Sequence, residues 1–198
     1  MKWNLAFSYP DNSVAVVNPR KWIMRLDSYH WSAVASEYYG EWQSFYLPEP
    51  SKLFPTAPLV STVEHKTILD VGAGCGETAA FYFDKGARKI IAVEIDRQSS
   101  KMIKTNASLN DWNIEIINSP FDFTCLSRHE IDLAKIDCEK CEVGMLDCDE
   151  ILFDVITEIH GRDLLVAFRK KFPDMKVRQR LYNSEFGDLY YAIVPRLR

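Results

Sequence analysis

One short stretch in the second half of the chain gathers residues that could do chemistry. Residues 135–142 read KIDCEKCE and contain three carboxylates and two thiols: Asp137, Glu139, Glu142, Cys138 and Cys141. Such a set could form a metal site, an acid/base pair or the acidic end of a buried strand. The residue types alone leave all three alternatives open, so the surrounding elements must decide between them.

A second group of residues is typical of a turn that binds a ligand. Residues 68–78 read ILDVGAGCGET, which places Gly72, Gly74 and Gly76 between a predicted strand and a predicted helix. Glycine suits this turn because the backbone must bend tightly and let a ligand approach closely. Glu94 lies at the end of the next predicted strand, where a carboxylate can accept hydrogen bonds from both hydroxyls of a ribose. These residues predict a site for an adenosine-containing ligand.

Short apolar runs rich in Ile and Val predict the strands that position both groups. They cover residues 67–72, 89–96, 113–118, 131–137 and 153–160. Helical patterns over 76–87 and 96–111 separate the first three runs, and strands that alternate with helices predict a parallel sheet. Asp137 then lies at the carboxyl end of the fourth strand, where ligands bind in open α/β sheets. If the chain stays extended there, Asp137 and Glu139 share a face.

The end of the chain has a different pattern. Residues 175–183 and 189–195 read as strands, and the five residues between them leave no room for a helix. They predict a hairpin that adds antiparallel strands to the sheet edge. The expected fold is α/β: a mostly parallel seven-stranded sheet with helices on both faces and a C-terminal antiparallel hairpin. An aromatic-rich N-terminal cap precedes it.

The glycine turn resembles a known motif. Its G-x-G-x-G spacing, preceded by Asp70, is similar to the first motif of S-adenosylmethionine-dependent methyltransferases with a Rossmann-like fold (class I), whereas dinucleotide enzymes use G-x-G-x-x-G. The resemblance implies that S-adenosylmethionine is the cofactor and that Asp70 lies close to the ammonium of its amino-acid arm. Ala73 and Ile95 complete the predicted cofactor site around the glycines and Glu94.

The same resemblance gives a role to the loop after the third strand, residues 118–123 (NSPFDF). It implies that Asp122 accepts a hydrogen bond from the adenine amine and that Phe121 lies against the ring. The alternative is structural, with Asp122 as a helix N-cap and Phe121 as a core residue.

The opening stretch resembles the FkbM family of methyltransferases, in which the fourth strand runs into KID-x-E-G-x-E. The matching residues are Lys135, Ile136, Asp137, Glu139 and Glu142, and Lys140 stands where the family has glycine. ITEIHG, residues 156–161, matches the Glu-x-His end of the family's fifth strand. The resemblance covers about residues 65–195 and implies methyl transfer to a hydroxyl of a small molecule or glycan.

A hydroxyl acceptor needs a base, because its own pKa lies far above 7. His160 has a suitable pKa, and Asp137 or Glu139 could serve directly or orient such a base. In the structural alternative, His160 is a buried histidine bonded to Glu158, and Glu139 and Glu142 lie on a solvated first helical turn. Asp137 could also hold Mg²⁺ with other carboxylates, as in catechol-type methyltransferases, but we expect no metal.

RNA is the alternative acceptor. Residues 169–180 contain six basic residues and one acid, and this run could contact phosphates or form the exposed faces of a helix and a strand. The net charge of −4 argues against bulk electrostatic binding of nucleic acid.

The remaining composition is that of an intracellular globular protein. The 198 residues are 47% hydrophobic, and no apolar run approaches the roughly 20 residues of a membrane span, which with the lack of a signal-like N-terminus predicts a cytoplasmic location. The five cysteines are expected to be reduced and mostly buried thiols. Cys138, Cys141 and Cys148 would need a fourth ligand to form a structural zinc site.

We expect two parts in the chain. Residues 1–62 contain four of the five tryptophans and form the predicted cap, and residues 63–198 form the cofactor-binding domain. Residues 31–47 have helical spacing and could cover the acceptor pocket, or their aromatic side chains could extend the core.

Overall fold

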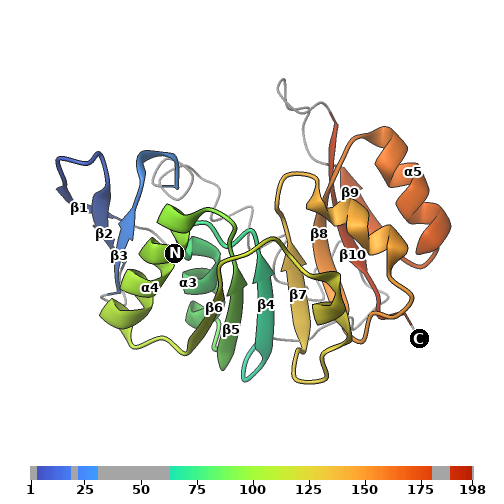
Figure 1. Ribbon diagram of the computed structural model, residues 1–198, viewed down its shortest axis with the longest axis horizontal. Coiled ribbons are helices and arrows are strands. Elements are labelled where there is room, and N and C mark those ends of the chain that lie inside the picture. Colours follow the sequence, from blue (N-terminus) through green and yellow to red (C-terminus); the bar gives the residue numbers. More distant parts are fainter. Residues whose placement is uncertain (1–3, 19–21, 31–62, 180–187, 198) are drawn as a thin grey trace.

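A seven-stranded sheet forms the centre of the computed structural model, which describes residues 4–18, 22–30, 63–179 and 188–197. Its strands lie in the order β6–β5–β4–β7–β8–β10–β9 (Figure 1). Their bounds are β4 Thr67–Val71, β5 Lys89–Val93, β6 Ile114–Ile117, β7 Leu133–Ile136, β8 Asp154–His160, β9 Lys176–Gln179 and β10 Leu189–Val194. The five strands from β6 to β8 pair in parallel, so the five predicted strands and their parallel arrangement are confirmed.

The predicted C-terminal antiparallel hairpin is present at the edge of the sheet. β10 pairs antiparallel with both β8 and β9. Since two reversals restore the original direction, β9 at the sheet edge runs the same way as the parallel strands. β10 is therefore the strand that runs against the rest of the sheet.

Helices cover both faces of the sheet. Two α-helices, α3 (Glu77–Asp84) and α4 (Arg97–Asn110), contribute to the core cluster that contains Ile68. A third, α5 (Arg162–Lys171), joins the cluster that contains the next residue, Leu69, together with the 3₁₀ helices η1 (Phe123–Ser127) and η2 (Cys141–Asp147). Neighbouring residues of a strand point to opposite faces, so the two clusters are the two sides of the sheet. None of the described helices has the length and apolarity needed to cross a membrane.

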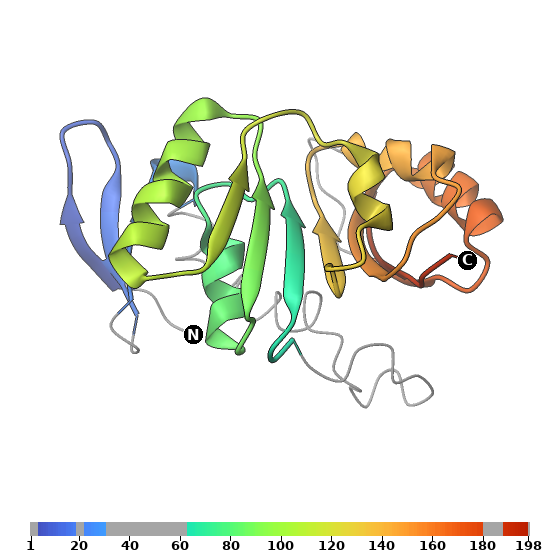
Figure 2. The same ribbon diagram turned by 60° about the horizontal axis from the view of Figure 1, so that its bottom comes forward.

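A small antiparallel sheet precedes the main one and packs on α4. It consists of β1 (Asn4–Ser8), β2 (Val14–Val17) and β3 (Ile23–Leu26), which lie beside α4 in both views (Figures 1 and 2). Val16, Met24 and Leu26 are fully buried in the same core cluster as α3 and α4. This part of the N-terminal segment therefore extends the core. From the sequence, that role was an alternative only for the aromatic side chains of residues 31–47.

Trp22 and Asn106 fix this packing. The Trp22 ring meets Trp112 edge to face at 5.0 Å between centroids. The buried Asn106 side chain of α4 accepts from Arg25 N at 2.7 Å and donates to Arg25 O at 2.9 Å, so it occupies hydrogen-bonding groups of β3. The predicted helix over 31–47 lies outside the described residues.

Candidate active site

The glycine turn between β4 and α3 requires glycine for two physical reasons. Gly72, Gly74 and Gly76 have φ of 72°, 55° and 90°, in the left-handed region that side chains disfavour. A Cβ on Gly72 would lie 1.9 Å from Asp137 O, so the turn packs directly against the backbone that leaves β7. Gly72 N and the buried Ala73 N both donate to Val93 O, at 3.0 and 3.3 Å, which ties the turn to the end of β5.

Glu94 follows β5 and holds the other side of this turn. Its two carboxylate oxygens accept from Gly74 N and from Asp96 N, each at 2.8 Å. Each oxygen has a further lone pair, so the carboxylate can still accept from ribose hydroxyls. The next residue, Ile95, is 68% exposed, which leaves an apolar surface beside Glu94 for a flat ring.

The loop after β6 has a more structural character than the motif implied. Asp122 caps η1 by accepting from Thr124 N at 2.9 Å, and this hydrogen bond lowers the pKa of Asp122. Phe121 is half-buried and meets Phe123 edge to face at 4.6 Å. The N-cap alternative therefore describes Asp122 in this structure, and contact of Asp122 and Phe121 with adenine stays a prediction.

Asn118 was not recognised from the sequence. Its Nδ2 donates to Glu94 O at 2.7 Å and to Ile95 O at 3.2 Å, so it fastens the β6 loop to the backbone that carries two predicted cofactor residues. No local pattern around Asn118 predicted this contact, because it depends on how β5 and β6 pair.

A buried ion pair lies beneath the glycine turn. Asp70 is fully buried, and its carboxylate lies 3.2 Å from Lys135 Nζ, which donates to Gly72 O at 2.9 Å. Burial alone would lower the pKa of Lys135, but the carboxylates of Asp70 and Asp137 raise it above its usual value. Lys135 thus stays charged and supports the turn, while contact between Asp70 and the cofactor's ammonium stays a prediction.

Two carboxylates meet at the ends of β7 and β8. Glu158 hydrogen bonds with Asp137 and with Tyr191 of β10. Burial, the charge of Asp137 and the hydrogen bond with it raise the pKa of Glu158 to about 8. At neutral pH the pair therefore keeps a proton between its two carboxyl groups, as close carboxylates do.

His160 forms a dyad with Glu142, a partner that the sequence analysis did not assign. Glu142 Oε1 lies 2.9 Å from His160 Nδ1 and also accepts from His160 N at 3.1 Å. The other ring nitrogen, Nε2, lies 3.4 Å from Glu139 Oε2 and 3.7 Å from Glu158 Oε2. Burial alone would lower the pKa of His160, but the hydrogen bond to Glu142 and the surrounding carboxylates raise it.

The environment of Glu142 excludes the structural alternative in which this residue lies on a solvated helical turn. Glu142 is fully buried, so it does not lie on a solvated first helical turn. Only Glu139, whose side chain is 60% exposed, keeps the solvent contact expected of such an acid. The second glutamate of the FkbM-like pattern was the one signal in the sequence that could have identified Glu142.

The turn from β7 into η2 corrects two expectations. Glu139 and Lys140 have φ of 53° and 80°, so the chain does not stay extended and the condition for the predicted shared face of Asp137 and Glu139 is not met. Cys138 and Cys141 form a disulfide across this turn, so they are not the reduced thiols that we expected. The bond also removes two of the three thiols of the zinc alternative, whereas Cys75, Cys125 and Cys148 are free.

These contacts bring the two predicted residue groups to one edge of the sheet. The cofactor residues lie at or just after the ends of β4, β5 and β6, Asp137 and Glu139 follow β7, and His160 is the last residue of β8. The groups adjoin, because Gly72 packs on Asp137 O and Lys135 Nζ lies 3.9 Å from Asp137 Oδ2. The arrangement can hold an adenosine-containing ligand beside a carboxylate-rich site that contains a buried histidine.

Comparisons with known proteins agree with this arrangement. The electron transfer flavoprotein beta subunit lysine methyltransferase of Mus musculus is 28% identical over 131 residues, which cover 62% of this chain and 48% of that protein. The ribosomal protein L11 methyltransferase of Caldicellulosiruptor saccharolyticus is 33% identical over 69 residues, which cover 35% of this chain and 23% of that protein. The chain therefore spans less than half the length of these two relatives. No family profile matches it.

A solved structure shows the same fold over nearly the whole chain. TYW2 of M. jannaschii in complex with AdoMet superposes with a TM-score of 0.62 at 13% identity and covers 98% of this chain and 90% of that one. A likeness at this identity establishes the fold, which is that of class I methyltransferases.

The fold, the site and these relatives together define an S-adenosylmethionine-dependent methyltransferase. The residues present fit the cofactor: a carboxylate with lone pairs for a ribose and an exposed apolar side chain beside it. The comparisons do not show membership of the FkbM family.

Proposed function

We propose that this methyltransferase acts in the manner of the FkbM family and transfers the methyl group to a hydroxyl of a small molecule or glycan. The observation that carries the proposal is the Glu142–His160 dyad at the carboxyl end of β8. A carboxylate on Nδ1 fixes the histidine tautomer and leaves Nε2 to receive a proton, which is the arrangement of a general base.

The mechanism assigns a distinct task to each group. S-adenosylmethionine supplies an electrophilic methyl group whose leaving group is already activated, so the protein must chiefly align the acceptor and exclude water. Glu94 and the glycine turn hold the cofactor in this proposal. His160 Nε2 takes the hydroxyl proton, and Glu142 stabilises the resulting imidazolium. Asp137 and Glu158, which share a proton, position the acceptor by hydrogen bonds.

A second candidate acceptor is a side-chain amine of a protein. The same carboxylates, Asp137, Glu139 and Glu158, would attract an ammonium group before it is deprotonated. One relative is named as a lysine methyltransferase, which agrees with this candidate.

RNA remains an alternative that the geometry favours less. Arg169, Lys170 and Lys171 form the last turn of α5. This helix begins just after His160, at the carboxyl ends of the parallel strands, and runs back toward their amino ends. These three basic residues therefore lie away from the proposed acceptor site. The side chains of residues 178–180 lie outside the described part of the chain.

The test follows the labelled methyl group. We expect cofactor carrying a tritiated methyl to label the small-molecule and glycan fraction of a cell extract through an ether bond. Label only in protein, released as a methylated amino acid, would establish the amine candidate. Label only in RNA, with binding that falls steeply as salt rises, would establish RNA and overturn the proposal.

The variant His160→Gln tests the base. It should lower kcat by roughly 10²- to 10⁴-fold while S-adenosylhomocysteine binds with unchanged affinity in calorimetry. Near-normal turnover would return His160 to a purely structural role. A loss of S-adenosylhomocysteine affinity as well would show a disturbed site. The control is Glu130→Gln, which changes an exposed acid outside the site and should leave both turnover and affinity unchanged.

A further inference from the structure

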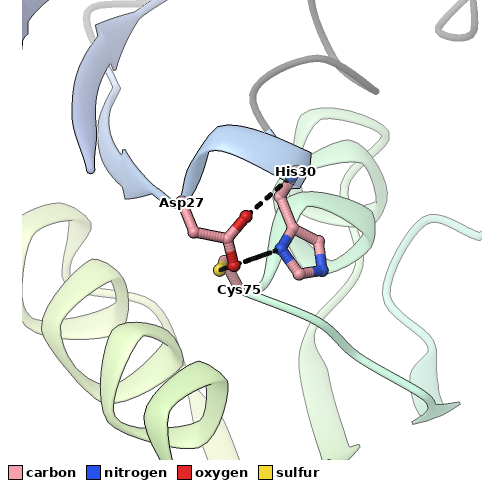
Figure 3. A group of neighbouring side chains, drawn as sticks. All are labelled: Asp27, His30 and Cys75. Carbon is pink, nitrogen blue, oxygen red and sulfur yellow. Dashed lines mark hydrogen bonds and ion pairs between the residues drawn. The ribbon is translucent and has the colours of Figure 1, made fainter. Parts of the chain in front are cut away.

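A cluster of three potential metal ligands adjoins the glycine turn, and none of its three side chains has a task in the proposed methyl transfer. Asp27 follows β3, His30 lies three residues further on, and Cys75 belongs to the glycine turn (Figure 3). Asp27 Oδ2 lies 2.7 Å from His30 Nδ1, and Cys75 Sγ lies 3.4 Å from that nitrogen and 3.6 Å from the same oxygen. Two segments that are 45 residues apart in the chain thus bring a carboxylate, an imidazole and a thiol to one point.

The geometry excludes a thiol relay of the catalytic-triad type. In such a relay the acid and the nucleophile use opposite nitrogens of the imidazole. Here the acid and the thiol both approach Nδ1, while Nε2 lies 3.6 Å from Glu77 Oε1. Cys75 is also fully buried, which removes it from any substrate. Three donor atoms that converge on one point are instead the arrangement of a metal site.

The distances suit a tetrahedral ion. Bonds of about 2.0 Å to nitrogen and oxygen and about 2.3 Å to sulfur place tetrahedral ligand atoms about 3.3 to 3.6 Å apart. The two distances from Cys75 Sγ already agree with this range. Only the Asp27–His30 hydrogen bond must open, by about 0.6 Å, for an ion to enter.

Neighbouring contacts hold the ligands in place. Asn106 Nδ2 donates both to Arg25 O and to Cys75 O, at 2.9 and 2.8 Å, so one α4 side chain fixes the two ligand-bearing segments relative to each other. Asp27 Oδ1 accepts from His30 N at 2.8 Å, and Cys75 N donates to Glu77 at 2.9 Å. Such outer contacts orient ligands in metal sites.

We propose that Asp27, His30 and Cys75 bind one Zn²⁺-class transition metal ion, with a fourth position open to water or another ligand. The mixed oxygen, nitrogen and sulfur donors favour Zn²⁺ over Mg²⁺ or Ca²⁺, which prefer oxygen. The side chains of Asp27 and His30 are 35% and 16% exposed, which gives the ion a route of entry. The bound ion fastens the segment after β3 to the glycine turn.

The experiment uses the full chain without an affinity tag, in a background where Cys138→Ser and Cys141→Ser remove the other cysteine pair. Zn²⁺ competition against a chromophoric chelator gives stoichiometry and affinity, and Co²⁺ gives a thiolate charge-transfer band in the near ultraviolet. We expect one ion per chain and a Co²⁺ band. Cys75→Ser should abolish the band and weaken Zn²⁺ binding by roughly 100-fold or more.

Two controls make the result decisive. Cys125→Ser removes a free thiol elsewhere and should leave the band and the affinity unchanged. Asp27→Asn keeps the shape of the cluster and should weaken Zn²⁺ binding even if Cys75→Ser proves unstable, which circular dichroism would reveal. Absence of a Co²⁺ band, or a band that persists in Cys75→Ser, would overturn the proposal. This readout is independent of methyl transfer and of its acceptor.

Discussion

The buried carboxyl of Glu158 makes a quantitative prediction about stability and pH. Burial and Asp137 raise its pKa from 4.5 to about 8, so the folded protein holds the proton more tightly than the unfolded chain does. A raised pKa contributes stability that is fully present below pH 4.5 and is lost as pH rises through about 8. Between pH 6 and pH 8 this single group should reduce the free energy of unfolding by about 2 kcal/mol.

Glu158→Gln removes the titration while it keeps the size and much of the hydrogen bonding of the side chain. The assay is urea denaturation of both proteins at pH 6, 7 and 8. Because His160 titrates in both, the informative quantity is the difference between their free energies of unfolding. We expect the variant to become relatively more stable by about 2 kcal/mol from pH 6 to pH 8. A difference that does not change with pH would refute the assignment of a protonated Glu158.

Two further substitutions test the cofactor site. Gly72→Ala should cost about 3 kcal/mol of unfolding free energy from left-handed strain and from overlap with Asp137 O, measured by urea denaturation. Gly76→Ala is its matched control, because Gly76 is also left-handed (φ 90°, ψ 18°) while a Cβ there would meet its nearest atom at an ordinary 3.7 Å, and an equal loss would contradict the overlap. Glu94→Ala should weaken S-adenosylhomocysteine binding by roughly 10- to 100-fold in calorimetry with the fold retained in circular dichroism. The exposed Glu130→Ala provides the comparison, and equal affinity of the two variants would remove the ribose assignment.

The strands and the glycine turn were predictable because their signals are local. The run 67–71 is buried throughout and mostly apolar, since both faces of a central parallel strand are covered, and the observed strand differs from the predicted one by a single residue. The turn at Gly72–Gly76 was equally readable, because left-handed backbone and close packing restrict the residue type. The stretch at residues 135–142 was located for the same reason, because it lies at the end of a strand that the pattern identifies.

The contacts within that stretch depend on pairings that local signals do not contain. Lys140 adopts φ of 80° although nothing in its residue type favours this, so the turn that ends the extended strand was missed. Glu142 faces inward because that turn and β8 bring it to His160, eighteen residues later. The edge order of β10 and β9 likewise depends on which strand β8 selects as its neighbour.

The sequence by itself determined the α/β class, the end of the sheet where the cofactor is expected and the residue types available there. Hydrophobic periodicity and the positions of glycines are properties of short segments, so they can be recognised without the fold. Only the tertiary structure decided which of these residues act together. It paired Glu142 with His160, Asp137 with Glu158, and Asp27 and His30 with Cys75, since each partnership joins segments whose distance in space is set by sheet order and core packing.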